Sequence, residues 1–240
     1  LIGTVISHCD DIIAHHQKEL EDLRQLKKLF LQKIFDQEWR FKGFTDAWEQ
    51  RKLLELTKIF DSARISNTLW TNKGIPYLRS SDINTESRQD ELSISPELFQ
   101  RLDKQTGSPK KGDLLIISGG TAKSVGLTFY KDDNSLVYVQ GGAILYAQTS
   151  KSSMVDGKFL HFEFLTRRLR KYVHDSMTGI SIRHFTIDPV SKTPIIFPSI
   201  NEQQTISGLF DGLDNAIAHH QKKLDQLQQL KKWFLQNMFV

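Results

Sequence analysis

The sequence predicts an α+β protein in which two long helices form an antiparallel coiled-coil pair around one mixed α/β domain. Three observations carry this prediction: a segment near the start recurs near the end, both copies hold an apolar seam, and short apolar runs separated by turn residues lie between them. Residues 10–36 and 214–240 are identical at 17 of 27 positions, 204 positions apart. The repeat divides the chain into a first helix at 1–38, a domain at 39–198 and a second helix at 199–240.

The first copy is expected to be one helix from the first residues to about Phe35. Its apolar and long side chains recur at alternating steps of three and four residues, which is the spacing of a heptad seam. The seam comprises Ile13, His16, Leu20, Leu23, Lys27, Phe30 and Ile34, and we expect Leu26 and Leu29 to widen it. Cys9 lies on the same side, so we expect a small core residue rather than a reactive thiol.

The second copy begins with a helix-start signal. Pro198 precedes Ser199 and Glu202 follows three residues later, a capping box that predicts a helix from there to Phe239. A long helix with one apolar seam needs a partner in water. We expect the copies to cover each other through Ile13, Leu20, Leu23 and Phe30 of the first and Ile217, Leu224, Leu227 and Phe234 of the second. The alternative is that each helix pairs with a second chain.

Between the copies, hydrophobic periodicity and turn residues predict a mixed insert. Ser95 and Pro96 form an N-cap and first helical position, so a helix is expected from there through Leu102. Further helices are expected at 48–56 and 159–173. Strands are expected at 75–79, 113–118, 125–130, 136–140, 143–148, 180–187 and 194–197.

The net charge of the chain is unevenly distributed. There are 32 Lys and Arg against 28 Asp and Glu, a formal charge of +4. Basic and acidic residues balance in each helix copy, so the basic excess lies in the insert, which favours a polyanionic partner. There is no run of 18 apolar residues, and the single cysteine excludes an internal disulfide, which fits a cytoplasmic protein.

No catalytic constellation is recognisable in the sequence. A stretch after one predicted strand resembles a phosphate-binding P-loop, but Ile117 and Ala122 stand where that motif requires glycine. Asp113 and Glu163 have no recognisable partner. We therefore expect no catalytic residue and no cofactor on this chain.

Two histidine pairs, His15-His16 and His219-His220, are equivalent positions of the repeat. Adjacent residues point to different faces of a helix, whereas metal ligands on one helix are typically four residues apart. We therefore expect no metal site and expect one histidine of each pair to lie in the helix seam.

Three polar or glycine-rich loops follow apolar strands and carry residue types that read base edges or approach phosphates closely. The candidate DNA-binding residues are Arg79, Ser80, Ser81, Lys110, Lys111, Ser118, Gly119, Gly120, Thr121, Lys123, Thr178 and Arg183. The basic run at 167–171 supplies further phosphate contacts in one interpretation and forms the solvated face of a helix in the other.

The order of these segments resembles the specificity subunit of type I restriction–modification systems over essentially the whole chain. The resemblance rests on 40–53 as the entry to a target-recognition domain, 75–83 as its early strand and loop, 111–121 as its central strand and loop, and 197–204 as its exit. Residues 60–67 replace the glycine-rich loop that is usual after the entry, so base-contacting residues do not transfer from the family. Such subunits usually hold two recognition domains, and the first copy begins at the place matching Thr205, so we expect a fragment or a half-sized subunit.

The resemblance implies that the domain reads one short half of a split double-stranded DNA target from the major groove. It implies that the helices act as a spacer and dock modification subunits, which carry S-adenosylmethionine and methyl-transfer chemistry and bring in restriction subunits. A half-sized subunit would form a homodimer and read a palindromic split target. The alternative function is a coiled-coil scaffold whose insert binds a protein. A nuclease or methyltransferase is disfavoured because the motifs are missing.

Overall fold

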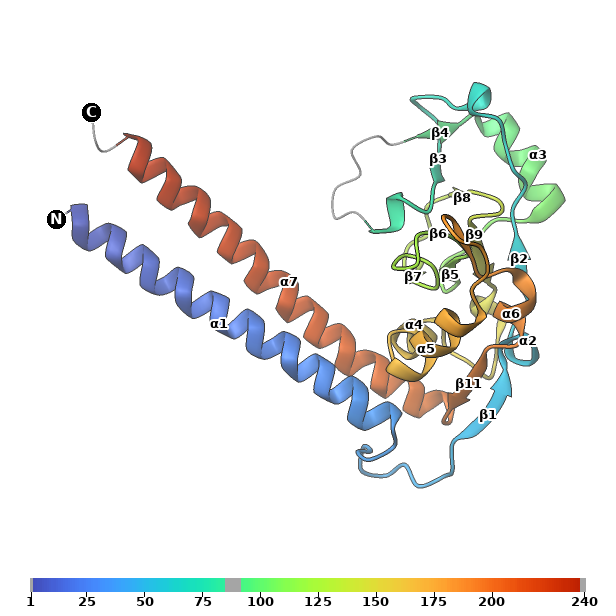
Figure 1. The fold of residues 1–240 in the computed structure, drawn as a ribbon, viewed down its shortest axis with the longest axis horizontal. Helices are drawn as coiled ribbons and strands as arrows, with labels where there is room; N and C mark the ends of the chain where they lie inside the picture. Colours follow the sequence, from blue (N-terminus) through green and yellow to red (C-terminus); the bar gives the residue numbers. More distant parts are fainter. Residues whose placement is uncertain (1, 85–91, 238–240) are drawn as a thin grey trace. The chain divides into compact units, whose positions relative to one another are not determined.

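The computed structural model describes residues 2–84 and 92–237. The chain divides into two compact units. Leu1–Arg40 with Ile206–Val240 form the first, which we call the helix unit, and Phe41–Thr205 form the second, which we call the mixed unit. Long helices combined with short strands confirm the predicted α+β class (Figure 1). No helix in the described residues is long and apolar enough to cross a membrane.

The helix unit is built from α1 (Ile2–Phe35) and the greater part of α7 (Ile200–Asn237). The two helices run antiparallel, so the N-terminal end of α1 and the C-terminal end of α7 lie at the same end of the pair (Figure 1). Lys27 forms an ion pair with Asp214. Lys231 and Asp10, the repeat equivalents of these two residues, form the same pair at the other end. A local twofold axis therefore relates the two copies.

Burial along the pair follows the predicted seam. Leu20 and Leu224, equivalent in the repeat, are 4% and 6% exposed. The other predicted interface residues are half-buried: Ile13, Leu23, Phe30, Ile217, Leu227 and Phe234. The expected widening is wrong, because Leu26 and Leu29 are exposed. A pair of helices buries one narrow stripe on each, and these two residues lie beside that stripe.

The mixed unit contains eleven strands in its described residues. They are β1 (Glu49–Lys52), β2 (Ile59–Asp61), β3 (Ile75–Leu78), β4 (Ser93–Ile94), β5 (Leu114–Ile117), β6 (Gly119–Gly120), β7 (Thr128–Tyr130), β8 (Tyr138–Val139), β9 (Ile144–Ala147), β10 (Arg183–His184) and β11 (Pro194–Phe197). Its α-helices are α2 (Leu53–Leu56), α3 (Pro96–Thr106), α4 (Gly157–Phe164), α5 (Arg167–Ser176) and α6 (Ile187–Ser191). Short 3₁₀ turns lie at Asn67–Leu69, Asp82–Asn84 and Thr149–Lys151.

Two sheets organise the core of the mixed unit. The first is antiparallel, with the order β2-β9-β5-β7, and all four side chains of its central strand β5 are fully buried. The second has the order β4-β3-β8, with β3 and β8 parallel. Tyr138 of β8 packs with Phe99 and Leu102 of α3, and its hydroxyl accepts a hydrogen bond from the N–H of Ala63 at 2.9 Å. These contacts fix the strand ends from which the loops described below emerge.

The predicted helix at 48–56 is wrong in its first half. Glu49–Lys52 form the strand β1, which pairs antiparallel with β11 near the other end of the mixed unit. Only Leu53–Leu56 are helical, and Leu53 and Leu56 are the residues that this turn buries. Local periodicity suggested a helix because the strand partner lies far away in the sequence.

The predicted helix at 159–173 is two helices. Thr166 ends the first and caps the second: its Oγ1 donates to the Glu163 carbonyl oxygen at 2.7 Å and accepts from the N–H of Leu169 at 3.3 Å. The Thr166 hydroxyl thus bonds to the last turn of α4 and caps the start of α5. The chain changes direction there, although the continuous apolar periodicity predicted a single helix.

The predicted strand at 180–187 is mostly irregular. Only Arg183 and His184 are in a strand, whereas Ile180 and Ile182 are exposed and Ile187 begins α6. The β-branched side chains therefore mark an exposed apolar segment rather than a buried strand.

The two carboxylates without a recognisable partner in the sequence are held inside the mixed unit. Asp113 accepts the N–H groups of Lys110 and Ser150 at 2.8 and 3.1 Å. Glu163 is completely buried, and its Oε1 accepts from the Arg168 guanidinium and from the N–H of Ile196 at 2.9 Å. Burial raises the pKa of Glu163 to about 7, against the opposing effect of Arg168 and the N–H of Ile196. Glu163 therefore joins the α4–α5 corner to β11.

We predict that Leu20→Ala and Leu224→Ala each lower the free energy of unfolding of the helix unit by about 2–5 kcal/mol, because each leaves a cavity in the seam. The matched control, Leu26→Ala, removes the same atoms from an exposed position and should cost about 0.5 kcal/mol or less. Urea unfolding followed by helical circular dichroism measures all three. Equal losses at Leu20 and Leu26 would contradict the seam.

We predict a pH effect from Glu163. Its pKa is raised on folding from 4.5 to about 7, so the folded protein binds the proton more tightly than the unfolded chain within this window. Its contribution to stability is complete below pH 4.5 and is lost as pH rises to about 7. Glu163→Gln should flatten the fall in the free energy of unfolding over this range. Glu55→Gln, at an exposed glutamate, should keep the wild-type slope, and an unchanged slope in Glu163→Gln would refute the assignment.

Candidate nucleic-acid interface

Four loop segments meet at one edge of the mixed unit. They follow β3 (79–82), follow β5 and include β6 (118–123), join β8 to β9 (140–143) and lead into β10 (178–183). The side-chain oxygen of Gln140 accepts the N–H of Ser80 at 3.3 Å, which joins the first segment to the third. The carbonyl oxygen of Ala143 accepts the N–H of Gly119 at 3.1 Å, which joins the third to the second. We call these four segments the glycine edge.

The fourth segment joins through a small sheet. β6 pairs antiparallel with β10, with Arg183 opposite Gly120 and His184 opposite Gly119. Thr178 and His184 exchange two backbone hydrogen bonds of 2.9 Å, which closes a hairpin over the residues between them. The structure thus brings together three of the predicted DNA-binding groups, those that begin at Arg79, Ser118 and Thr178.

Glycine at this edge permits close approach by an arginine. Gly142 has φ +75°, and a Cβ there would lie 2.4 Å from the guanidinium Nη2 of Arg64. The backbone of Gly141 lies equally close to Ser62, whose carbonyl oxygen would be 2.0 Å from an added Cβ. Arg64 therefore lies at the glycine edge. The sequence prediction missed it, because the only signal was the Gly141-Gly142 pair, which marks a close approach without naming the partner.

Asp82 orients Arg79 at the end of β3. The Arg79 Nη2 donates to Asp82 Oδ1 at 2.9 Å and Nε donates to Oδ2 at 3.1 Å, a two-point pairing of fork and carboxylate. Burial raises the pKa of Asp82, but the hydrogen bonds and charge of Arg79 outweigh it, and the pKa lies below its ordinary value. The adjacent Ser81 hydroxyl also donates to Asp82 Oδ1 at 3.1 Å. The guanidinium of Arg79 is thus held in one orientation.

Several backbone N–H groups of the 118–123 loop donate hydrogen bonds within the protein. The amides of Ser118 and Gly119 donate to Ala143, and that of Thr121 donates to Ser124 Oγ at 3.0 Å. These three amides are therefore not available to a phosphate group. Thr121 and Lys123 remain exposed on this loop. Their side chains are therefore accessible to a ligand.

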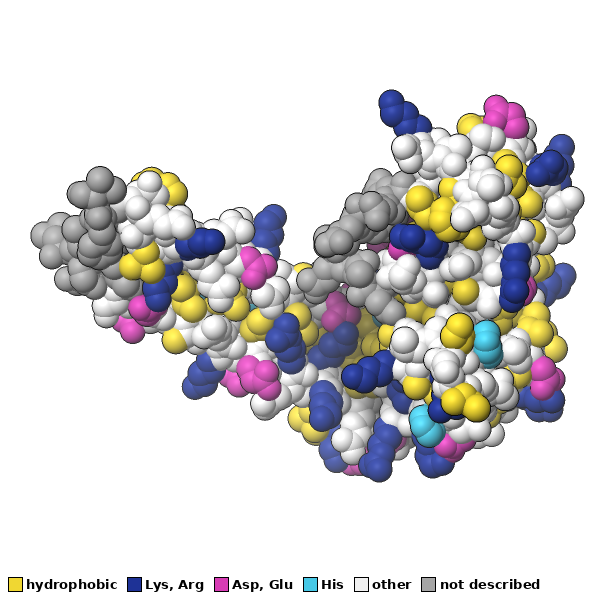
Figure 2. Space-filling model, turned by 45° about the horizontal axis from the view of Figure 1, so that its top comes forward, with side chains coloured by type: hydrophobic (Ala, Val, Ile, Leu, Met, Phe, Trp, Pro, Cys, Tyr) yellow, Lys and Arg dark blue, Asp and Glu magenta, His cyan; other side chains and the backbone are white. Residues whose placement is uncertain are grey.

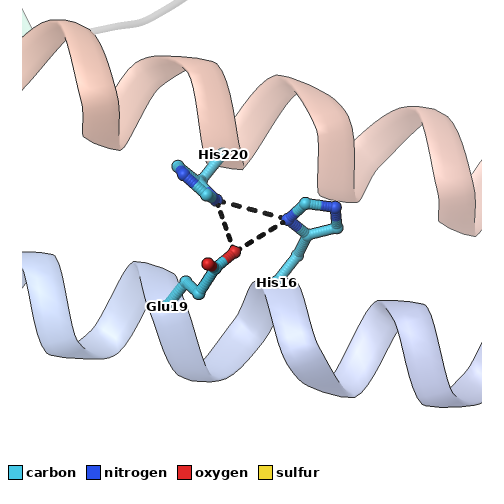
Figure 3. Close-up of side chains that lie close together, drawn as sticks. All are labelled: His16, Glu19 and His220. Atoms are coloured by element: carbon cyan, nitrogen blue, oxygen red, sulfur yellow. Dashed lines mark hydrogen bonds and ion pairs between the residues drawn. The ribbon is translucent and has the colours of Figure 1, made fainter.

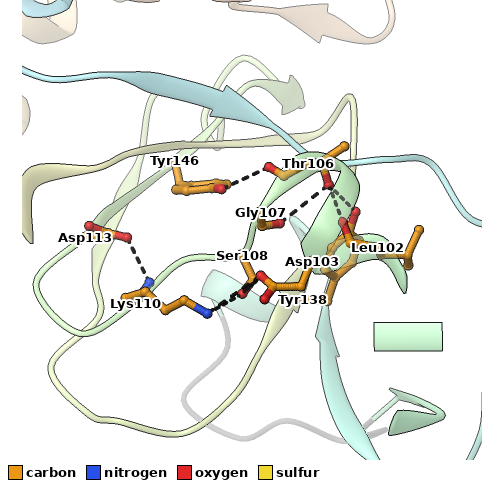
Figure 4. Close-up of polar contacts among 9 residues, drawn as sticks. All are labelled: Leu102, Asp103, Thr106, Gly107, Ser108, Lys110, Asp113, Tyr138 and Tyr146. Carbon is orange, nitrogen blue, oxygen red and sulfur yellow. Dashed lines mark hydrogen bonds and ion pairs between the residues drawn. The ribbon is translucent and has the colours of Figure 1, made fainter. Parts of the chain in front are cut away.

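Lys110 and Lys111 lie away from the glycine edge, at the opposite end of β5. The ammonium group of Lys110 donates to Ser108 Oγ at 2.9 Å and lies 3.7 Å from Asp103 Oδ1 (Figure 4). Lys111 is exposed beside it. Their predicted role in DNA binding stays a prediction, and the structure does not group them with the other candidates.

The basic run at 167–171 is partly internal. Arg168 is bound by Glu163 and by the carbonyl oxygen of Pro194, at 2.7 Å. Burial lowers the pKa of Arg170, and Lys171 pairs with Asp175. Arg167 is exposed. At least Arg168 therefore serves the α4–α5 corner, which the two sequence interpretations did not include.

Two isoleucines extend from the hairpin that precedes β10. Ile180 is 91% exposed and Ile182 is 62% exposed, between the exposed Thr178 and the half-buried Arg183. The Arg183 guanidinium donates to the carbonyl oxygen of Gly179, which holds the charge beside the apolar tip. Lys and Arg side chains are scattered over much of the face of the mixed unit drawn in Figure 2. The glycine edge thus combines oriented cations, hydroxyls and an apolar tip.

Comparisons with known proteins agree with the resemblance. A family model described as the type I restriction modification DNA specificity domain matches residues 45–229. The type I restriction enzyme MjaVIII specificity subunit of Methanocaldococcus jannaschii is 23% identical over 252 residues, which cover 96% of this chain and 56% of that protein. The chain thus spans little more than half the length of this relative.

Solved structures share the fold. A crystal structure of a type I restriction–modification S subunit from M. genitalium aligns with a TM-score of 0.65 and 14% identity, covering 100% of this chain and 60% of that one. The HsdS subunit from Thermoanaerobacter tengcongensis aligns with a TM-score of 0.61 and 14% identity, covering 99% and 56%. The family model covers well over half of the sequence, and the fold agrees with it. The chain belongs to the type I restriction–modification DNA specificity family.

Proposed function

We propose that the mixed unit reads a short sequence of double-stranded DNA and that the chain performs no catalysis of its own. The observation that carries this proposal is the glycine edge, where Arg64, Arg79, Lys123 and Arg183 come from four separate parts of the chain. Sequence reading needs side chains that converge on one groove, and scattered basic residues supply only non-specific attraction.

The side chains of the glycine edge can form hydrogen bonds and apolar contacts with DNA bases. An arginine fork that a carboxylate orients is pre-organised to donate two hydrogen bonds to guanine O6 and N7 in the major groove. Thr121, Ser80 and Ser81 supply hydroxyls, and the exposed Ile180 offers an apolar contact to a thymine methyl group. Lys123 supplies a phosphate contact, which positions the protein without reading sequence.

We infer that the helix unit acts as a spacer and docks modification subunits. Exposed apolar residues recur at equivalent positions of the repeat: Leu26 and Leu230, then Leu29 and Trp233. The local twofold axis places one such patch on each half of the pair, which suits two copies of one partner. A second recognition domain comes from a longer form of this chain or from a homodimer.

The methyl-transfer chemistry belongs to the modification subunits in this proposal. S-adenosylmethionine would bind there and not on this chain, and restriction subunits would join through the same complex. Such an assembly acts on the DNA of the cell, so we place the chain in the cytoplasm.

We predict that Arg79→Ala weakens binding to the cognate DNA by about 1–3 kcal/mol and relaxes the preference at one base pair. The matched control is Arg101→Ala, which removes an exposed arginine on α3. Fluorescence anisotropy with cognate and single-mismatch duplexes, in the complex with modification subunits, measures both. An Arg79→Ala variant with wild-type affinity and wild-type mismatch penalties would remove Arg79 from the interface.

We predict a steep salt dependence of DNA binding, because phosphate contacts release counterions. The cognate duplex should stay preferred over a scrambled one at each salt concentration. A scaffold whose insert binds a protein would show neither effect while still co-purifying with its partner.

A further inference from the structure

Three potential metal ligands lie together between the two helices of the helix unit (Figure 3). The Nδ1 atoms of His16 and His220 are 3.2 Å apart. Oε2 of Glu19 lies 3.3 Å from the first and 3.1 Å from the second. The three side chains point toward one another, and all three atoms belong to groups that bind transition metals.

Antiparallel pairing of a repeat creates this cluster. Each copy has two adjacent histidines, and the second of each faces the seam: the His16 and His220 side chains are 18% and 22% exposed, whereas that of His15 is 67% exposed. His16 and His220 are equivalent positions, so they meet close to the local twofold axis. The repeat equivalent of Glu19 is Lys223, so the carboxylate occurs once and the cluster is a single site.

We propose that His16, Glu19 and His220 bind one Zn²⁺ ion. Four ligands around zinc at about 2.0–2.1 Å in a tetrahedron are about 3.3 Å apart. The three ligand atoms are separated by 3.1–3.3 Å, so one point lies at zinc-bonding distance from all three. Glu19 is 39% exposed, which leaves the fourth position open to water.

The ligand set favours zinc over the hard cations. Two imidazole nitrogens and one carboxylate oxygen suit Zn²⁺, whereas Mg²⁺ and Ca²⁺ prefer oxygen ligands alone. His15 Nε2 lies 3.4 Å from the other oxygen of Glu19, Oε1, and can orient the carboxylate from outside the ligand shell. The sequence led us to expect no metal site, because we considered the two histidines of each pair on one helix. The site proposed here combines one histidine from each of the two helices.

Zinc here would clip the two helices together. The ligands come from both helices, so the ion binds the paired helices and not the separated ones, and binding stabilises the pair. The clip lies near the local twofold axis, between the ion pairs formed by Lys27 and Lys231. It would stiffen the spacer proposed above, but its binding does not depend on DNA or on a modification subunit.

The test is a titration of the full chain, freed of metal with a chelator, with ZnCl₂. We expect one Zn²⁺ per chain and a higher melting temperature of the helical signal. His16→Asn and His220→Asn should each weaken zinc binding by more than about 10-fold. Removing only the hydrogen-bond partner of a metal ligand typically costs at least that much affinity, and these variants remove the ligand itself. His219→Asn, at the exposed neighbouring histidine, should bind zinc as the wild type does. MgCl₂ should not change the melting temperature.

The result that would overturn the proposal is a wild-type chain that binds no zinc, or a His220→Asn variant that binds it as tightly as His219→Asn does. Circular dichroism without metal checks that each variant still forms helices. If the histidine variants unfold, Glu19→Gln gives the same test at a more exposed ligand, and wild-type affinity in that variant excludes Glu19 from the site.

Discussion

The antiparallel burial of one apolar seam by its own copy is the constraint on which the helix unit depends. Burying a leucine side chain stabilises by about 1.5–3 kcal/mol, whereas a surface ion pair contributes about 0–1 kcal/mol. Leu20 and Leu224 therefore provide stability, and the pairs Lys27–Asp214 and Lys231–Asp10 set the register. Because the two copies share most of their sequence, the Lys27–Asp214 pair has an equivalent in Lys231–Asp10, and His16 meets its own equivalent, His220, near the axis.

The sequence predicted the two helices well because their signal is local and doubled. Periodicity also located the buried strand β5, whose apolar run is continuous. It failed where the deciding partner is distant, as at Glu49–Lys52, which form a strand only because β11 is beside them. The periodicity was misleading again at Thr166, whose hydroxyl bonds to the end of one helix and the start of the next, so that one predicted helix is two. Leu26 and Leu29 were misassigned because composition does not show how wide the contact is.

The sequence predicted part of the candidate site. Loops that follow β3 and β5 emerge on one side of the unit, so residue types alone identified Arg79 and Gly119 as a plausible group. The sequence does not show that Asp82 holds Arg79 or that Arg64 lies against Gly142. The first is a local pairing of side chains three residues apart, and the second is a tertiary contact between a side chain and the backbone of a glycine. The histidine cluster is of the same kind, since it exists only once the helices are paired.

We propose that this chain supplies sequence specificity to an enzyme that other subunits carry. The most direct measurement is to express it with its modification subunit in cells that lack other methylation and to map every methylated base. The account predicts methylation confined to one defined motif, split by a gap of fixed length, and palindromic if two copies of this chain form the complex. Methylation without a motif, or the same motif when residues 41–198 are exchanged for those of another specificity subunit, would contradict it.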